Sequence, residues 1–227
     1  MDTIMPWIIN SFKDEDIVRQ AAFISISEFA KHIPDAIVPY HKALVPILLA
    51  GVQDKQDIIC MKSCYAVSYY ISCLKTEHFN EHMNSLLETI ISRLQNQHSD
   101  PEVSEHTINA LSAVISQAGD RFHPYFNPVI AILKHLMSIQ DVNLLHVRAR
   151  ATECVGILAA SSSRELFLPH FNVRFFSLLY PPFPFPFRFP FFRFSSILLF
   201  LFFYFIFLGE CVRMVSFDGL TGVTYLA

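Results

Sequence analysis

Apolar residues recur at intervals of three and four positions through most of residues 1–172. This spacing is typical of amphipathic α-helices that bury one face. Four of the predicted helices begin alike, and their aligned apolar positions are 43, 42 and 44 residues apart, at Val18, Met61, Val103 and Val147. Landmarks before the partner helices repeat with steps of 42, 43 and 45 residues, at Pro39, Glu81, Pro124 and Pro169. The sequence therefore predicts repeated units of two helices.

Units of this length stack on one another, because neither helix buries its apolar face within a single unit. No alternating strand pattern interrupts residues 1–172, so the expected fold class is all-α. We expect an α-solenoid, an armadillo-type superhelix of about four units, with bounds near 1–38, 39–79, 80–122 and 123–168. The first unit is expected to start inside its first helix, because Pro6 aligns with Pro46 of the next unit.

The first unit carries a recognisable pattern of residue types. A proline lies in its first helix, an aspartate lies at the end of that helix, and Val-Arg-x-x-Ala opens the second helix. In this sequence those residues are Pro6, Asp14, Val18, Arg19 and Ala22. The pattern resembles the HEAT repeat. The second and fourth units keep parts of it, and the third departs from it.

The resemblance implies a ladder of ion pairs between units. In HEAT arrays the basic residue that opens the second helix pairs with the aspartate that ends a first helix. The matching residues here are Asp14, Asp54, Arg19, Lys62 and Arg148. We expect this ladder to be structural, with each exposed pair contributing about 0–1 kcal/mol. The alternative is that the inner surface contacts a partner, through Arg19, Lys62, Arg148 and Arg150, the last of which is expected to face solvent.

One run of residues in the fourth unit is more specific than the HEAT pattern, because it points to a particular family. Residues 147–156 read Val-Arg-Ala-Arg-Ala-Thr-Glu-Cys-Val-Gly, between the segments 122–126 and 166–171. Together these segments are similar to the middle of importin-β superfamily receptors, also called karyopherin-β, and most similar to the importin-4 type. The resemblance covers about residues 1–172.

Membership would imply a segment of a nuclear import receptor, found in the cytoplasm, the nucleus and the nuclear pore. Such receptors bind cargo proteins with nuclear localisation signals on the inner surface of the second helices. They bind phenylalanine-glycine nucleoporins on the outer surface of the first helices, and they release cargo when they bind Ran-GTP. Because the family's main Ran contacts lie in N-terminal repeats, we expect this chain to bind Ran weakly or not at all.

Composition changes abruptly after Asn172. Residues 1–172 hold all ten His and 18 of the 20 acids, whereas residues 173–208 hold 14 of the 23 Phe and no acid, Lys or Gly. This is low-complexity sequence. Val173-Arg174 is what a splice donor encodes in this frame, and pyrimidine-rich codons encode Phe, Leu, Pro and Ser. We therefore interpret residues 173–227, including an irregular tail at 209–227, as translated intron, which sequencing of mature transcripts tests.

The competing interpretation is a membrane anchor at 194–209, or a HEAT scaffold of another kind that carries one. Sixteen uncharged residues are fewer than the roughly 20 that a spanning helix needs, so we disfavour membrane insertion. The net charge of −3 shows no basic excess, which argues against nucleic-acid binding.

Motifs for catalysis and cofactors are nearly absent. The sequence contains no glycine-rich phosphate loop, no Gly-x-Ser-x-Gly and no Cys-x-x-Cys, so we expect neither an enzyme nor a cofactor or metal site, and we expect the cysteines to be buried. His78-Phe-Asn-Glu-His82 does match the H-x-x-E-H pattern of inverted zinc peptidases. Because this motif is expected at a joint between helices, we interpret it as an exposed turn. The aromatic residues Tyr69, Tyr70, Phe122 and Phe126 are expected to pack in the core or between units rather than to form a nucleoporin pocket.

Overall fold

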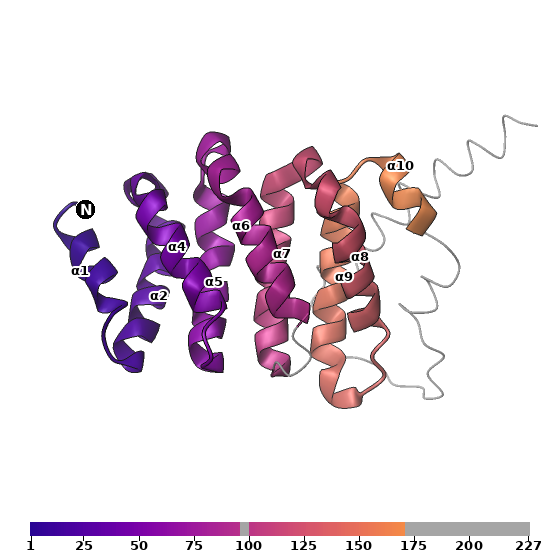
Figure 1. Cartoon of the computed structure of the whole chain (residues 1–227), viewed down its shortest axis with the longest axis horizontal. Coiled ribbons are helices and arrows are strands. Elements are labelled where there is room, and N and C mark those ends of the chain that lie inside the picture. The colour runs from indigo at the N-terminus through magenta and orange to yellow at the C-terminus, as the bar shows by residue number, and fades with distance from the viewer. Residues whose placement is uncertain (96–99, 171–227) are drawn as a thin grey trace, which may run out of the picture. The chain divides into compact units, whose positions relative to one another are not determined.

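A computed structural model describes residues 1–95 and 100–170 of the chain. Within these ranges every regular element is helical, which confirms the all-α prediction (Figure 1). The α-helices are α1 (Ile4–Ser11), α2 (Asp16–His32), α3 (Pro34–Ile37), α4 (His41–Val52), α5 (Asp57–Cys73), α6 (Thr76–Gln95), α7 (Pro101–Ala118), α8 (Phe126–Met137), α9 (Leu145–Ala160) and α10 (Arg164–Phe167). Short 3-10 helices are η1 (Val38–Tyr40), η2 (Gly119–Tyr125), η3 (Val142–Leu144) and η4 (Leu168–His170). The predictions for 173–227 lie outside the described residues.

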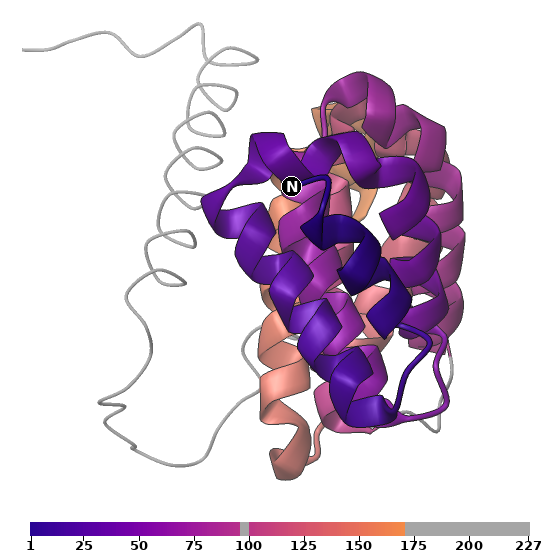
Figure 2. The same ribbon diagram turned by 90° about the vertical axis from the view of Figure 1, so that its left-hand side faces the viewer.

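The helices stand in two layers, as the view from the N-terminal side shows (Figure 2). In one layer α2 packs on α5, α5 on α7 and α7 on α9. In the other layer α4 packs on α6 and α6 on α8. Each pair of successive helices also packs together, α4 on α5, α6 on α7 and α8 on α9. This is the predicted solenoid, and we call α2, α5, α7 and α9 the B helices and α1, α4, α6 and α8 the A helices.

The B helices begin two to four residues before the aligned apolar positions of the sequence pattern. At α7, Pro101 occupies the first helical turn, and the Asp100 carboxylate accepts a hydrogen bond from the Glu102 amide at 2.8 Å. This cap satisfies an amide that the helix leaves without a partner, and a proline at that position loses no helical hydrogen bond. Gly119 ends the helix with φ of 53°, which suits glycine.

Helix α6 begins at Thr76, earlier than the landmark at Glu81 predicted. Helices α4 and α8 follow 3-10 segments that contain Pro39 and Pro124, and proline limits how far a helix extends toward its N-terminus. The segment before Glu81 contains no proline, so helix continues through it. The H-x-x-E-H motif therefore lies on a continuous helix, and its interpretation as an exposed turn was wrong.

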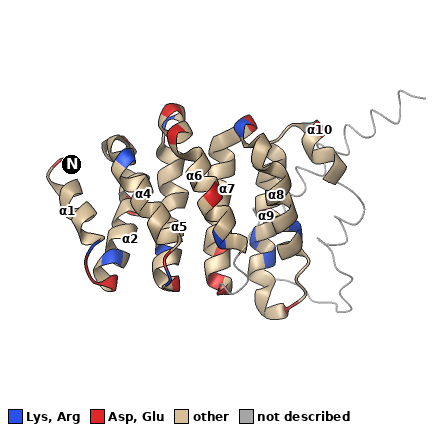
Figure 3. Cartoon of the chain, in the orientation of Figure 1, with Lys and Arg blue, Asp and Glu red and all other residues tan. Residues whose placement is uncertain are grey.

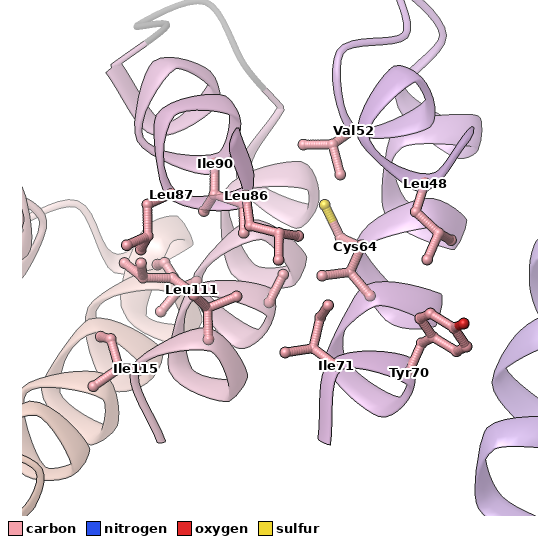
Figure 4. Packing of buried hydrophobic residues seen from close by; sticks show 14 of the residues in the cluster. Leu48, Val52, Cys64, Tyr70, Ile71, Leu86, Leu87, Ile90, Leu111 and Ile115 are labelled. Atoms are coloured by element: carbon pink, nitrogen blue, oxygen red, sulfur yellow. The ribbon is translucent and has the colours of Figure 1, made fainter. Parts of the chain in front are cut away.

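The core is a continuous apolar seam between the layers. Figure 4 shows side chains from α4, α5, α6 and α7 converging, including Leu48, Val52, Cys64, Ile71, Leu86, Ile90 and Leu111. All of these are at most 1% exposed. Cys60, Cys64 and Cys154 are buried free thiols, which fits their expected role as small apolar residues.

One described segment, Pro34–Val52, is long and apolar enough to cross a membrane by length and composition, with a mean hydropathy of 1.3. It comprises α3, η1 and α4 rather than one uninterrupted helix. Its residues Leu44, Val45 and Leu48 are buried, and α4 packs on α5 and α6. Its apolar residues therefore pack in the core of the solenoid.

At Gly51 the A helix α4 lies close to side chains of the B helices α2 and α5. A Cβ atom built on Gly51 would lie 2.5 Å from Phe23 Cζ and 2.6 Å from Ser63 Oγ. Alanine is the better helix former by about 1 kcal/mol, but the overlap is larger than packed side chains tolerate.

We predict that Gly51→Ala lowers the free energy of unfolding by about 1–3 kcal/mol, because overpacking outweighs the gain in helix propensity. Urea unfolding followed by far-UV circular dichroism measures the change. Ala43→Ser adds one atom at an exposed position of the same helix and should change stability by less than about 0.5 kcal/mol. An unchanged or raised stability of Gly51→Ala would contradict this packing.

Candidate functional site: the B-helix surface

The B-helix surface consists of the solvent-facing sides of α2, α5, α7 and α9. Acidic and basic residues occur together near the ends of these helices (Figure 3). Polar contacts join each B helix to its neighbour or to the turn that precedes it. These contacts determine which charged side chains are already paired within the solenoid and which are available to a partner.

Arg19 joins the first unit to the second. Its Nη2 forms an ion pair with Asp54 in the turn before α5, and its Nη1 lies 3.0 Å from Asp16 Oδ1. Asp16 in turn accepts a hydrogen bond from the Gln56 side chain. Burial favours a raised pKa for Asp54, but hydrogen bonds from the Gln56 amide and the Arg19 guanidinium outweigh it, so this pKa lies below its usual value.

The other residues of the predicted ladder are placed differently. Asp14 is exposed and accepts a hydrogen bond from the adjacent Glu15 amide at 2.8 Å. Lys62 makes no ion pair with any residue in the described ranges. Arg148 donates to the Ile139 carbonyl at 3.4 Å. Between the described residues, Arg19–Asp54 is thus the one rung of that ladder.

Arg93 links the second and third units, and no pattern in the sequence predicted this role. Its side chain is 10% exposed, with Nη2 at 3.2 Å from Asp57 Oδ1 and Nη1 at 3.4 Å from the Asp54 carbonyl. The available signal was its position on the apolar face of α6, one turn beyond Ile90 and two turns beyond Leu86. An arginine there must find a polar partner on the neighbouring unit.

Arg150 links the third and fourth units. Its Nε lies 2.9 Å from Glu105 Oε1 on α7, and its Nη1 lies 2.9 Å from Glu153 Oε2 on α9. The side chain is 38% exposed, so it faces solvent in part while bridging two helices. The hydrogen bond with Glu105 is the main cause that raises the pKa of the guanidinium.

A lysine and two tyrosines form a cluster between α2 and α5. Lys31 Nζ lies 2.7 Å from Glu28 Oε1 and 2.7 Å from the Tyr65 hydroxyl. It also lies 4.3 Å from the centre of the Tyr69 ring, a distance at which a cation is attracted to an aromatic face. The hydrogen bonds to Glu28 and Tyr65 raise the lysine pKa. The cluster therefore presents aromatic rings held in place by a charge.

The aromatic residues predicted to pack in the core or between units divide into two groups. Tyr70, Phe122 and Phe126 are buried, and the Tyr70 hydroxyl donates to the Ile37 carbonyl at 3.3 Å. Tyr69 is 37% exposed and lies beside Tyr65 on the B-helix surface. Tyr69 therefore lies outside the core, and it packs between units, the other role expected for it, since Lys31 of α2 lies over its ring.

Residues 1–153 match the family model described as importin subunit beta-1-like, TPR repeats. That match covers well over half of the chain. The chain belongs to the importin-β family. The units here are longer than the 34 residues typical of TPR motifs, and their length agrees with HEAT repeats.

Among curated relatives of this family, the probable importin subunit beta-4 of Schizosaccharomyces pombe is 24% identical over 172 residues. The alignment covers 75% of this chain and 16% of that protein. Importin subunit beta-2 of the same yeast is 24% identical over 142 residues, which is 59% of this chain and 15% of the relative. The chain thus spans about a sixth of the length of these relatives.

Solved karyopherin structures share the fold. Kap121p bound to the SUMO protease Ulp1p superposes with a TM-score of 0.70 and 15% identity, over 79% of this chain and 17% of Kap121p. Outside the importins, cullin-associated NEDD8-dissociated protein 1 of Arabidopsis thaliana is 26% identical over 126 residues, 53% of this chain and 10% of that protein.

We predict a coupling free energy of about 0.5–1 kcal/mol between Arg19 and Asp54 in a double-mutant cycle of Arg19→Ala and Asp54→Ala. Both side chains are largely but not fully buried, at 23% and 18% exposure, so solvent screens the pair only in part. Because the pKa of Asp54 is lowered, its carboxylate is charged at neutral pH, and the coupling is complete there. As the pH falls below 3.8 and through the lowered pKa, the carboxylate is protonated and the coupling is lost.

Urea unfolding of the four proteins measures this coupling. Asp14→Ala is the matched control, since Asp14 lies in the equivalent turn of the first unit and is exposed. It should change stability by less than about 0.5 kcal/mol. Zero coupling between Arg19 and Asp54, or a coupling that persists in acid, would mean that the pair does not join the units.

Proposed function

We propose that this chain is a segment of a nuclear import receptor of the importin-4 type, which uses its B-helix surface to contact cargo. Family membership supports the transport role, and the yeast beta-4 importin aligns over more of this chain than the beta-2 importin does. Kap121p, which shares the fold, is bound to other proteins in its solved complexes. Cargo proteins with nuclear localisation signals, Ran and phenylalanine-glycine nucleoporins are the proposed partners of the whole receptor, which would pass between cytoplasm and nucleus.

The exposed face of α5 is the observation that carries the proposal. Lys62, Tyr65 and Tyr69 follow one another at spacings of three and four residues, so they lie along one side of the helix. Tyrosine is among the side chains that most often anchor protein interfaces, whereas lysine is depleted at them, so we expect Tyr65 and Tyr69 to contribute most of the contact. Of the four basic residues proposed to bind a partner, Arg19 and Arg150 are held in ion pairs, and Arg148 donates to a backbone carbonyl. Lys62 is therefore the one we favour for a contact with cargo.

A HEAT scaffold with a different partner is the second candidate. The match to cullin-associated NEDD8-dissociated protein 1, which is not named as an importin, favours it. Both candidates use the B-helix surface for protein contact, and neither needs catalysis.

We predict that a fluorescent peptide carrying a basic nuclear localisation signal binds the chain, and that Tyr69→Ala weakens binding about tenfold. Truncating an aromatic anchor typically removes more than 1 kcal/mol of binding free energy, and a tenfold change corresponds to about 1.4 kcal/mol. Fluorescence anisotropy measures the change. Trp7→Ala removes an aromatic side chain that is 76% exposed on the A helix α1, and it should leave binding unchanged.

Ran-GTP and a phenylalanine-glycine peptide should bind this segment weakly at most. Equal loss of peptide binding in Tyr69→Ala and Trp7→Ala would contradict the assignment to the B-helix surface. Failure of any nuclear localisation peptide to bind would instead favour the scaffold.

A further inference from the structure

On the A-helix side, three histidines meet where the second unit packs on the third. His41 is the first residue of α4 and is 5% exposed. His78 and His82 lie one turn apart near the start of α6, with Glu81 beside them. His41 Nδ1 lies 3.0 Å from His82 Nε2, and the His41 ring stacks on the His78 ring at 4.1 Å between centroids.

The repeat explains why these residues meet. His41 and His82 are 41 residues apart, close to the length of one unit, so the repeat places them side by side although His41 begins α4 and His82 lies in the second turn of α6. Equivalent positions of adjacent units lie side by side in a solenoid. Other junctions of this layer pair a tyrosine with an amide or a carboxylate at this place, as Tyr125 does with Asn84 at 3.0 Å. At the junction between the second and third units, the side chains at this place are imidazoles instead.

The donor atoms are arranged as a metal ion requires. One ligand atom each from His41, Glu81 and His82 lies within 4.8 Å of the other two. In a tetrahedral zinc site with Zn–N bonds of about 2.0–2.1 Å, two imidazole nitrogens are about 3.3 Å apart. The two nitrogens at 3.0 Å need separate by only about 0.3 Å to admit the ion. Glu81 is exposed, so its carboxylate can adjust.

A hydrogen bond between His41 and His82 is the ordinary alternative, and zinc titration distinguishes it from a bound ion. Neutral imidazole is the form that binds metal ions.

We propose that His41 Nδ1, His82 Nε2 and the Glu81 carboxylate bind one Zn²⁺ ion, with water as the fourth ligand, and that the ion ties the A helices of adjacent units together. Two imidazoles and a carboxylate suit zinc among the metals available to such a donor set. The donors come from the A helices α4 and α6 of adjacent units, so the ion would join them, and Glu81 as a ligand would not be free to act as the base that an inverted zinc peptidase needs. The proposal does not depend on the proposed transport function.

The test is isothermal titration of the full chain, stripped with a chelator, with zinc chloride at neutral pH. We expect one ion per chain and a rise in the thermal unfolding midpoint when zinc is added. Glu81→Gln removes a ligand at an exposed position without disturbing the core, and it should weaken zinc binding at least about tenfold. His82→Gln should weaken it further. His146→Gln, at an exposed histidine of α9, is the matched control and should bind zinc as the original chain does.

Cobalt substitution gives a second readout. Co²⁺ bound by nitrogen and oxygen produces visible bands without the intense near-ultraviolet band of a cobalt–thiolate bond. Absence of zinc binding would overturn the proposal, and so would a thiolate band, because the ion would then sit on cysteines. Equal affinity in the original chain, Glu81→Gln and His82→Gln would overturn it as well.

Discussion

In the described part of the chain, each long helix inside the array has apolar residues on more than one side. It buries all of them only when helix pairs pack on it from both neighbouring units. Helix α5 shows the constraint most clearly, since Ile59, Cys64, Val67 and Ile71 are all fully buried and α5 packs on α2, α4 and α7. No single unit can satisfy that requirement, so stability is expected to spread through nearest-neighbour contacts. The polar links at Arg19, Arg93 and Arg150 lie at these same junctions between units. Apolar packing holds the units together there, and the polar links fix how the packed surfaces align.

Periodicity alone predicted most of the fold, because each helix pair repeats one solution to the same burial problem. The start of α6 was the exception, and it depended on a proline that the other joints have and this one lacks. Because of that local difference, the H-x-x-E-H motif at 78–82 lies on a helix and not in the turn that we expected. The prediction of a solenoid survived the error, since extending one helix by a turn does not alter which face it buries.

The surface chemistry could be predicted only in part. The pairing of Arg19 with Asp54 follows from the pattern that successive repeats share, whereas no sequence spacing predicted that Arg93 would pair with Asp57 or Arg150 with Glu105. The His41–His82 contact could have been inferred from the 41-residue separation, because the period places equivalent residues side by side. Side-chain direction could not be predicted from the sequence, and it separates exposed Tyr69 from buried Tyr70 and so decides which tyrosine is available to a partner.

Hydrogen–deuterium exchange of the full chain tests the central claim, which is that stability comes from stacking between units. Backbone amides of α5 and α7 should exchange slowest, since each of these helices is packed against neighbours in both layers. Amides of α1, which packs principally on α2, should exchange fastest among the A helices. Uniform protection from α1 through α9, or slower exchange in α1 than in α5, would contradict the claim.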